Sequence, residues 1–128
     1  MITLTPAGGL QPLWEARGVT SLRSQWRWFQ EQAPGELILM QVGKRLEAYD
    51  GGALDLVAVT GERLDPVARI GFAASAGVGL GRVAELCRRV RRAKLAYRLV
   101  VEEGYLRRGM RRRVVREWWI PLGSDSGS

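Results

Sequence analysis

The chain has 128 residues, with 20 Lys and Arg against 13 Asp and Glu, five Trp, one Cys and no His. This length is enough for one domain with its own hydrophobic core, and a hydrophobic content of 46% argues against a disordered arm. A single Cys excludes a disulfide framework, and the lack of His removes the commonest acid–base group and metal ligand. We therefore expect no cofactor, no metal site and no catalytic residue.

The net charge of +7 is the strongest bulk signal. Thirteen of the cations fall within residues 82–116, where they are opposed only by Glu85, Glu102 and Glu103. Nearly all are arginine, which pairs with phosphate and stacks on bases. A basic stripe of this kind is typical of a nucleic-acid binder, and we expect it to form one continuous surface. The alternative is that these arginines are merely solvated.

Three segments can be separated by composition. Residues 1–20, with several Pro and Gly, predict an irregular N-terminal segment, residues 21–121 the folded domain, and residues 122–128 a flexible tail. The longest apolar runs are too short to cross a bilayer, and the start lacks the pattern of a signal peptide. We therefore expect no membrane partner and a cytoplasmic location.

The first predicted helix runs from an N-cap at Thr20 or Ser21 to about Ala33. Its apolar residues recur at helical spacing, whereas Trp28 lies off this stripe and is expected to be partly exposed. The run Leu37–Met40 then predicts a buried strand, and Leu46–Tyr49 a returning strand.

The glycine corner between these two strands carries Lys44 and Arg45, which predicts a small polar tip on a rigid base. Residues 53–60 fit either a strand or a helix. Residues 67–72 predict a short strand, and the Gly- and Ala-rich residues 73–81 a close-packed loop. That loop lacks the Lys and Ser or Thr of a phosphate-binding loop, so a nucleotide site is not expected there.

The clearest predicted helix covers residues 81–94, with Arg88, Arg89 and Arg92 on a basic face. Cys87 falls on the apolar stripe, so it is expected to act as a small buried hydrophobe. A strand over residues 97–103 and a final strand over residues 110–121 enclose an arginine-rich turn. The predicted fold is α+β: a small mixed sheet flanked by about three helices.

Three stretches resemble the N-terminal, mismatch-recognising domain of the MutS DNA-repair family. Residues 43–53, Gly-Lys-Arg-Leu-Glu-Ala-Tyr-Asp-Gly-Gly-Ala, resemble its Gly-Asp-Phe-Tyr-Glu-(apolar)-Phe-x-x-x-Ala segment. Residues 99–103 and 110–121 occupy the places of its Val-Ala-(apolar)-Cys-Glu-Gln strand and its basic strand that ends in Pro. The chain thus looks like a stand-alone MutS-like domain, because no ATPase phosphate-binding loop is present.

The resemblance implies DNA or RNA as a partner. It also implies that Glu47 keeps the family's polar contact with a base, whereas Arg45 replaces the wedging phenylalanine and Lys44 an acid. A guanidinium can stack on a base or enter a narrow minor groove, but it does not unstack a duplex as an aromatic side chain does. Stand-alone domains of this kind resemble accessory proteins of polymerases such as the reverse transcriptases of diversity-generating retroelements.

We therefore predict a non-enzymatic, nucleic-acid-binding accessory domain that grips the phosphate backbone through an arginine-rich helix and strand. The predicted contacts are Lys44, Arg45, Glu47, Arg88, Arg89, Arg92, Arg107, Arg108, Arg111 and Arg113. The alternative is a protein-interaction subunit with an interface of Trp28, Trp118 and Trp119. For catalysis, only a metal-binding cluster of scattered carboxylates would be available, with Asp50 and Asp55 beside Glu47 as the best candidates, and it is not expected.

Overall fold

A computed structural model describes residues 2–4, 21–107 and 109–122. Six strands form one mixed sheet, in which β2 and β5 pair in parallel and the other neighbours pair antiparallel. The order across the sheet is β1 (Ile2–Leu4), β6 (Met110–Ile120), β5 (Tyr97–Arg107), β2 (Leu37–Val42), β3 (Arg45–Tyr49) and β4 (Ser75–Gly79).

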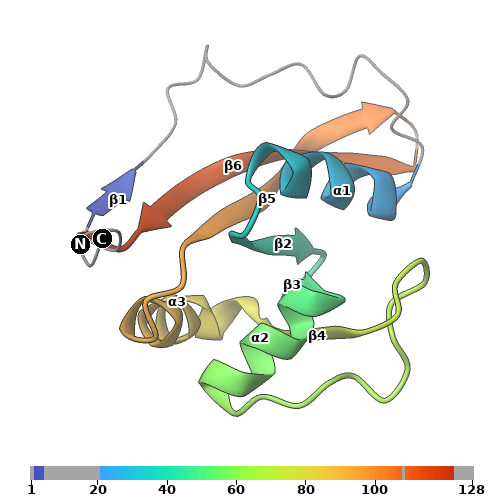
Figure 1. Ribbon diagram of the computed structural model, residues 1–128. Helices are drawn as coiled ribbons and strands as arrows, with labels where there is room; N and C mark the ends of the chain where they lie inside the picture. The colour runs from blue at the N-terminus through green and yellow to red at the C-terminus, as the bar shows by residue number, and fades with distance from the viewer. Residues whose placement is uncertain (1, 5–20, 108, 123–128) are drawn as a thin grey trace.

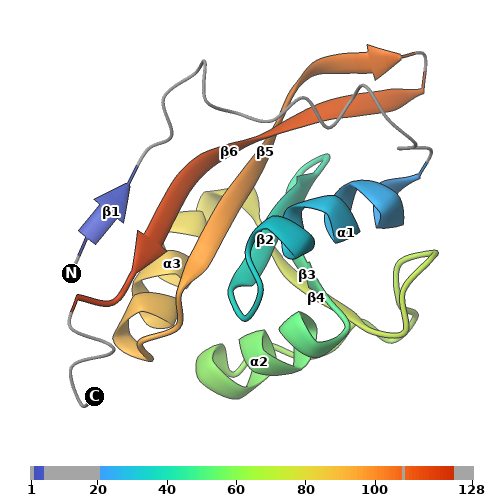
Figure 2. The ribbon, with the colours of Figure 1, turned by 45° about the horizontal axis from the view of Figure 1, so that its top comes forward.

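Helices cover both faces of this sheet. Helix α1 (Leu22–Gln32) packs on one face, and α2 (Gly51–Thr60) and α3 (Val83–Arg92) pack on the other, as Figures 1 and 2 show. A 3₁₀ turn at Leu80–Arg82 leads into α3. The predicted α+β class is confirmed, with a small mixed sheet and three α-helices among the described residues.

Two hydrophobic cores lie on opposite faces of the sheet, and strand β2 contributes to both. Leu37 and Leu39 pack toward α2 and α3, whereas Ile38 and Met40 pack with Phe29 of α1. Because successive side chains of a strand point to opposite faces, a strand covered on both sides needs the unbroken apolar run that the sequence has here.

Helix α1 begins where the sequence predicts. The Ser21 hydroxyl accepts a hydrogen bond from the Ser24 N–H at 3.1 Å, and the Ser24 hydroxyl accepts one from the Ser21 N–H at 3.0 Å. This reciprocal capping satisfies backbone donors that a helix start leaves open. After Ala33, Pro34 and the left-handed Gly35 (φ 79°) end the helix.

Residues 53–60, which fit either a strand or a helix, lie in α2, which ends at the left-handed Gly61 (φ 77°). The predicted strand over residues 67–72 is wrong, since residues 61–74 form an irregular connection, here called the 61–74 loop. The predicted loop over residues 73–81 is also wrong, because it contains β4. Ala76 and Val78 of β4 are buried, and that burial holds the strand against β3.

The prediction of an irregular N-terminal segment needs one correction, because Ile2–Leu4 pairs with β6 as the edge strand β1. Residues 5–20 and the tail beyond residue 122 lie outside the described residues. Within the described part of the chain, none of the helices has the length and apolar character needed to span a bilayer.

Candidate nucleic-acid interface

The excess positive charge is confined to two segments. Residues 82–94 contain six cations and one acid, and residues 102–113 contain five cations and two acids. The rest of the chain has one more acid than cations, so these two segments account for the whole net charge. The first segment includes α3. The second, here called the hairpin arm, is the end of the β5–β6 hairpin that extends beyond the other strands (Figures 1 and 2).

The outer side of α3 carries exposed, unpaired cations. Leu86, Cys87 and Val90 bury the inner side of the helix. Arg88 and Arg92, one helical turn apart, are exposed, and within the described structure neither forms an ion pair. Lys94 follows in the left-handed conformation (φ 64°) and is also exposed. We call Arg88, Arg92 and Lys94 the α3 basic face.

The other α3 arginines attach the helix to its neighbours. Arg89 donates to the Thr60 carbonyl at 2.7 Å and pairs with Glu85 at 3.2 Å. Arg91 donates to the Tyr97 hydroxyl at 2.7 Å. Arg89, predicted to contact phosphate, therefore already has partners, although its side chain is 46% exposed. Cations in the last helical turn also offset the partial negative charge of the helix C-terminus.

Arg113 of the hairpin arm was predicted to contact nucleic acid. The structure corrects this prediction, because the side chain is buried and bonds to other parts of the fold. It is 5% exposed and donates to the Gln41 carbonyl at 2.9 Å and to Glu102 at 3.0 Å. It also donates to Gln25 of α1, whose amide donates to the Arg111 carbonyl at 2.8 Å. Burial lowers the pKa of Arg113, whereas the Glu102 carboxylate acts in the opposite direction. Arg113 thus connects the arm to β2 and α1.

Arg111 and Arg112 lie nearer the surface of the arm. The Arg111 guanidinium carbon lies 4.5 Å from the centre of the Tyr105 ring, and Nη1 lies 3.6 Å from Glu102. Arg112 pairs with Glu103 at 3.0 Å, and both side chains are partly exposed. The side chain of Arg107 and the whole of Arg108, which were predicted contacts, lie outside the described residues.

The turn between β2 and β3 presents only one of its three predicted contacts. Lys44 is exposed in the turn. Glu47 is fully buried, and its carboxylate accepts from the Tyr49 hydroxyl at 2.8 Å, from Arg69 Nε at 2.9 Å and from Arg45 at 3.0 Å. The prediction that Glu47 contacts a base is wrong in this structure, because the 61–74 loop covers that side of β3.

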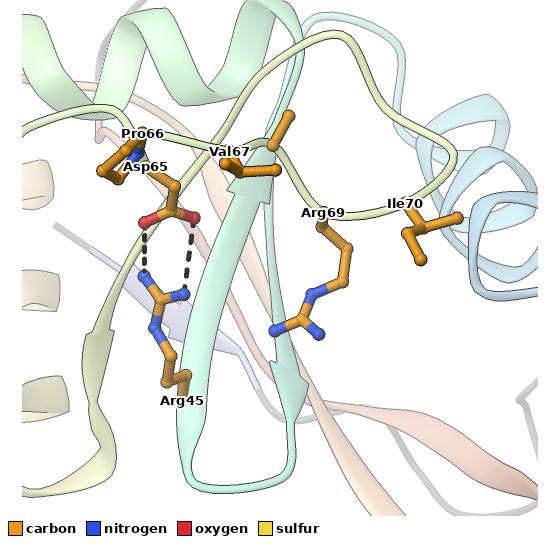
Figure 3. A pocket seen from close by; sticks show the side chains of 7 residues that line it. Arg45, Asp65, Pro66, Val67, Arg69 and Ile70 are labelled. Atoms are coloured by element: carbon orange, nitrogen blue, oxygen red, sulfur yellow. Dashed lines mark hydrogen bonds and ion pairs between the residues drawn. The ribbon is translucent and has the colours of Figure 1, made fainter.

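Arg45 is committed to the same network. Its guanidinium forms a bidentate pair with Asp65 at 2.9 and 3.3 Å, shown in Figure 3. The hydrogen bond from Arg45 to Asp65 is the largest of the effects that raise the pKa of Arg45. Burial acts to raise the pKa of Asp65, but hydrogen bonds from Arg45 and Ser75 outweigh it, so the pKa lies below its usual value. The guanidiniums of Arg45 and Arg69 thus neutralise the carboxylates of Glu47 and Asp65.

A pocket of about 520 Å³ opens beside this network. Arg45, Asp65 and Arg69 supply its polar wall, and Figure 3 shows these side chains together with the loop residues that complete the lining. Val67 and Ile70 in the lining are 84% and 94% exposed. The pocket is therefore charge-balanced with an apolar rim, unlike the two basic segments.

The three tryptophans of the alternative interface lie in different environments. Trp28 is half-buried, with its ring 5.2 Å from that of Phe29. Trp118 is half-buried, with the Arg98 guanidinium 3.8 Å from its ring centre. Trp119 is 1% exposed and stacks on Tyr97 in the core. The prediction that Trp119 forms an interface is therefore wrong, because its side chain packs in the core with residues of α3.

The carboxylates considered for catalysis do not converge. Glu47 is buried under the 61–74 loop, whereas Asp55 is exposed on α2, across the sheet. Asp50 accepts hydrogen bonds from the N–H groups of Ala73 and Ala74. No group of acidic or Cys side chains within the described residues is arranged to hold a metal ion. Burial raises the pKa of the Cys87 thiol, which opposes formation of the reactive thiolate.

Sequence reasoning missed three residues of these sites: Asp65 and Arg69, which hold the turn network, and Tyr105 on the arm. An aromatic residue among the arginines of residues 102–113 was the one available signal, and it points to Tyr105. The sequence matches no model of a known protein family and no curated protein.

Proposed function

We propose that this chain is a non-enzymatic nucleic-acid-binding module that holds phosphates on the α3 basic face and on the hairpin arm. The observation that supports this most strongly is the α3 basic face. Arg88 and Arg92 are exposed one helical turn apart, Lys94 is exposed just beyond the end of the helix, and none of the three has an acidic partner within the described structure. Their charge is not neutralised by an ion pair within the described structure, so it is available to a polyanion.

The arm, with five cations and two acids in its sequence, is the second proposed contact and lies away from the first. Strand β5 starts beside α3 and has eleven residues, which span about 35 Å at roughly 3.3 Å per residue. Helix α3 lies near the start of β5 and the tip of the arm near its end (Figure 2). This replaces the expected single continuous surface by two.

We further propose that the module is an accessory domain of a polymerase, such as a reverse transcriptase. It is supported by the resemblance of residues 43–53 and 110–121 to MutS-like accessory domains. The burial of Glu47 and the pairing of Arg45 with Asp65 leave no base contact at the motif, which favours phosphate binding without mismatch recognition.

The test is equilibrium binding of the full chain to fluorescent RNA and DNA between about 50 and 200 mM salt. We expect the logarithm of the association constant to fall linearly with the logarithm of salt concentration, because bound cations release counterions from the phosphates. Absence of binding to either nucleic acid at the lowest salt would rule out the proposed function.

A second candidate function, protein binding, is favoured by the exposure of Val67 and Ile70 at the pocket rim. Such apolar side chains on one loop are typical of an interaction site when they form a patch. A variant with Val67→Ser and Ile70→Ser should keep nucleic-acid affinity unchanged if the two functions use different surfaces. Loss of nucleic-acid binding in that variant would show that the loop belongs to the first function.

A further inference from the structure

Tyr105 is exposed among the charged residues of the arm. The residue is 66% exposed, and its neighbours on the arm include Arg111 and Arg112 together with their acidic partners Glu102 and Glu103. A large aromatic side chain in this position gains little from the core of the protein. Aromatic rings beside cations are the combination with which proteins bind unpaired bases and the phosphates that join them.

The strand pairing of the arm is irregular on both sides of Tyr105. Tyr105 pairs with Arg111 across the hairpin, and register shifts lie on both sides of it, between Glu102 and Tyr105 and between Tyr105 and Arg107. Gly104 adopts a left-handed conformation (φ 72°) at the first of these shifts. Irregularities of this kind redirect individual side chains from a strand.

Arg111 holds the ring from one side. Its guanidinium carbon lies 4.5 Å from the centre of the Tyr105 ring, its Nε donates to the Gly104 carbonyl at 3.0 Å, and it approaches Glu102. These contacts fix a cation against the ring before any ligand binds, so the ordering cost on binding is reduced. The ring keeps most of its surface exposed for a further stacking partner.

We infer that Tyr105 is a stacking platform for one unpaired base, so that the nucleic acid bound by the hairpin arm is single-stranded. This inference rests on the proposed function and specifies its ligand. The bases of a duplex are already paired and stacked on one another, and they cannot lie on Tyr105 without opening. Stacking does not read the base edges, so the arm should accept different sequences.

The test compares the full chain with Tyr105→Ala and Tyr105→Phe on a fluorescent single strand of about 12 nucleotides and on a duplex of the same length. We expect Tyr105→Ala to weaken single-strand binding about five- to 150-fold, the equivalent of losing one stacked base. Tyr105→Phe keeps the ring and should stay within about twofold of the wild type. Duplex binding should change by less than about twofold in either variant.

Three outcomes overturn the inference. If Tyr105→Ala binds the single strand as well as the wild type, or if Tyr105→Phe is as weak as Tyr105→Ala, the ring is not a stacking platform. If the wild type prefers the duplex, the ligand is not single-stranded. In these cases the proposed function survives, because the chain still binds nucleic acid. If neither oligonucleotide binds, the proposed function fails together with the inference.

Discussion

Arg69 and Glu47 form a two-point contact that attaches the 61–74 loop to the sheet. Arg69 Nε donates to Oε1 of Glu47 at 2.9 Å and Nη2 donates to Oε2, while the Glu47 side chain is fully buried. A buried carboxylate is tolerated only when its lone pairs are satisfied. The hydrogen bonds from Arg69, Arg45 and Tyr49 meet that requirement, so the loop and strand β3 depend on each other.

Replacing Arg69 should therefore destabilise the fold. We expect Arg69→Ala to lower the free energy of unfolding by about 2 kcal/mol, because it removes charge-assisted hydrogen bonds from a buried acceptor. Urea denaturation measures this change. Arg63→Ala is the control, since Arg63 is exposed in the same loop and forms no ion pair within the described structure. Equal stability of the two variants would show that the Glu47 network contributes nothing.

Gly77 of β4 allows the close approach on which the same network depends. A Cβ atom at this position would lie 2.4 Å from the Leu46 carbonyl oxygen and 3.0 Å from Glu47 Cγ. Gly77→Ala should cost about 2 kcal/mol, because backbone would have to move. Gly79→Ala in the same strand meets nothing within 4 Å and should change stability by less than about 0.5 kcal/mol. If both variants unfold at the same urea concentration, the packing of β4 described above is wrong.

Asp50 should make stability depend on pH in the acid range. Burial acts to raise the pKa of Asp50, but hydrogen bonds from Ala73, Ala74 and Arg23 outweigh it, and the pKa lies below its usual value. The ionised form is therefore favoured by folding. Its contribution is present above the unfolded-state pKa of about 4, and it is lost as the pH falls through the lower folded-state value.

Chemical denaturation between about pH 2 and pH 7 measures this effect. We expect Asp50→Asn to lose less stability than the wild type as the pH falls below about 4, because it lacks the titrating carboxylate. Asp55→Asn is the control, since Asp55 is exposed and forms no ion pair within the described residues. Parallel pH profiles for the wild type and Asp50→Asn would contradict this assignment.

Trp119 and Trp118 should respond differently to truncation. Trp119 is buried in the core cluster under α3, so Trp119→Ala should cost about 3–5 kcal/mol or prevent folding. Trp118 is half-buried beside Arg98, and Trp118→Ala should cost clearly less. Thermal unfolding compares the two variants. A stable Trp119→Ala protein would restore the interpretation of Trp119 as an interface residue.

Much of the fold follows from local patterns in the sequence. The stripe in α1, the apolar run of β2 and the amphipathic α3 each determine an element without reference to the rest of the chain. Strand β4 could not be predicted in this way. Its sequence, Ser-Ala-Gly-Val-Gly, has weak strand preference, and it forms a strand because β3 pairs with it and the core accepts Ala76 and Val78.

The candidate site could be predicted only where the periodicity of a single element decided which side chains are exposed. Arg88 and Arg92 were predicted correctly as exposed, since they lie opposite the apolar stripe of their own helix. Arg113 and Glu47 were misjudged because their partners come from distant segments, Gln25 in one case and Arg69 in the other. Sequence spacing within one element does not reveal a partner that is brought in by the fold.

The salt dependence of nucleic-acid binding tests the central claim most directly. A double variant, Arg88→Ala with Arg92→Ala, is compared with a control of equal net charge, Arg27→Ala with Arg63→Ala, both of whose arginines are exposed. We predict weaker binding and a log–log salt slope reduced in magnitude by about 2 for the first variant, and the wild-type slope for the control. Equal slopes and affinities in the two variants would contradict the assignment of phosphate binding to α3.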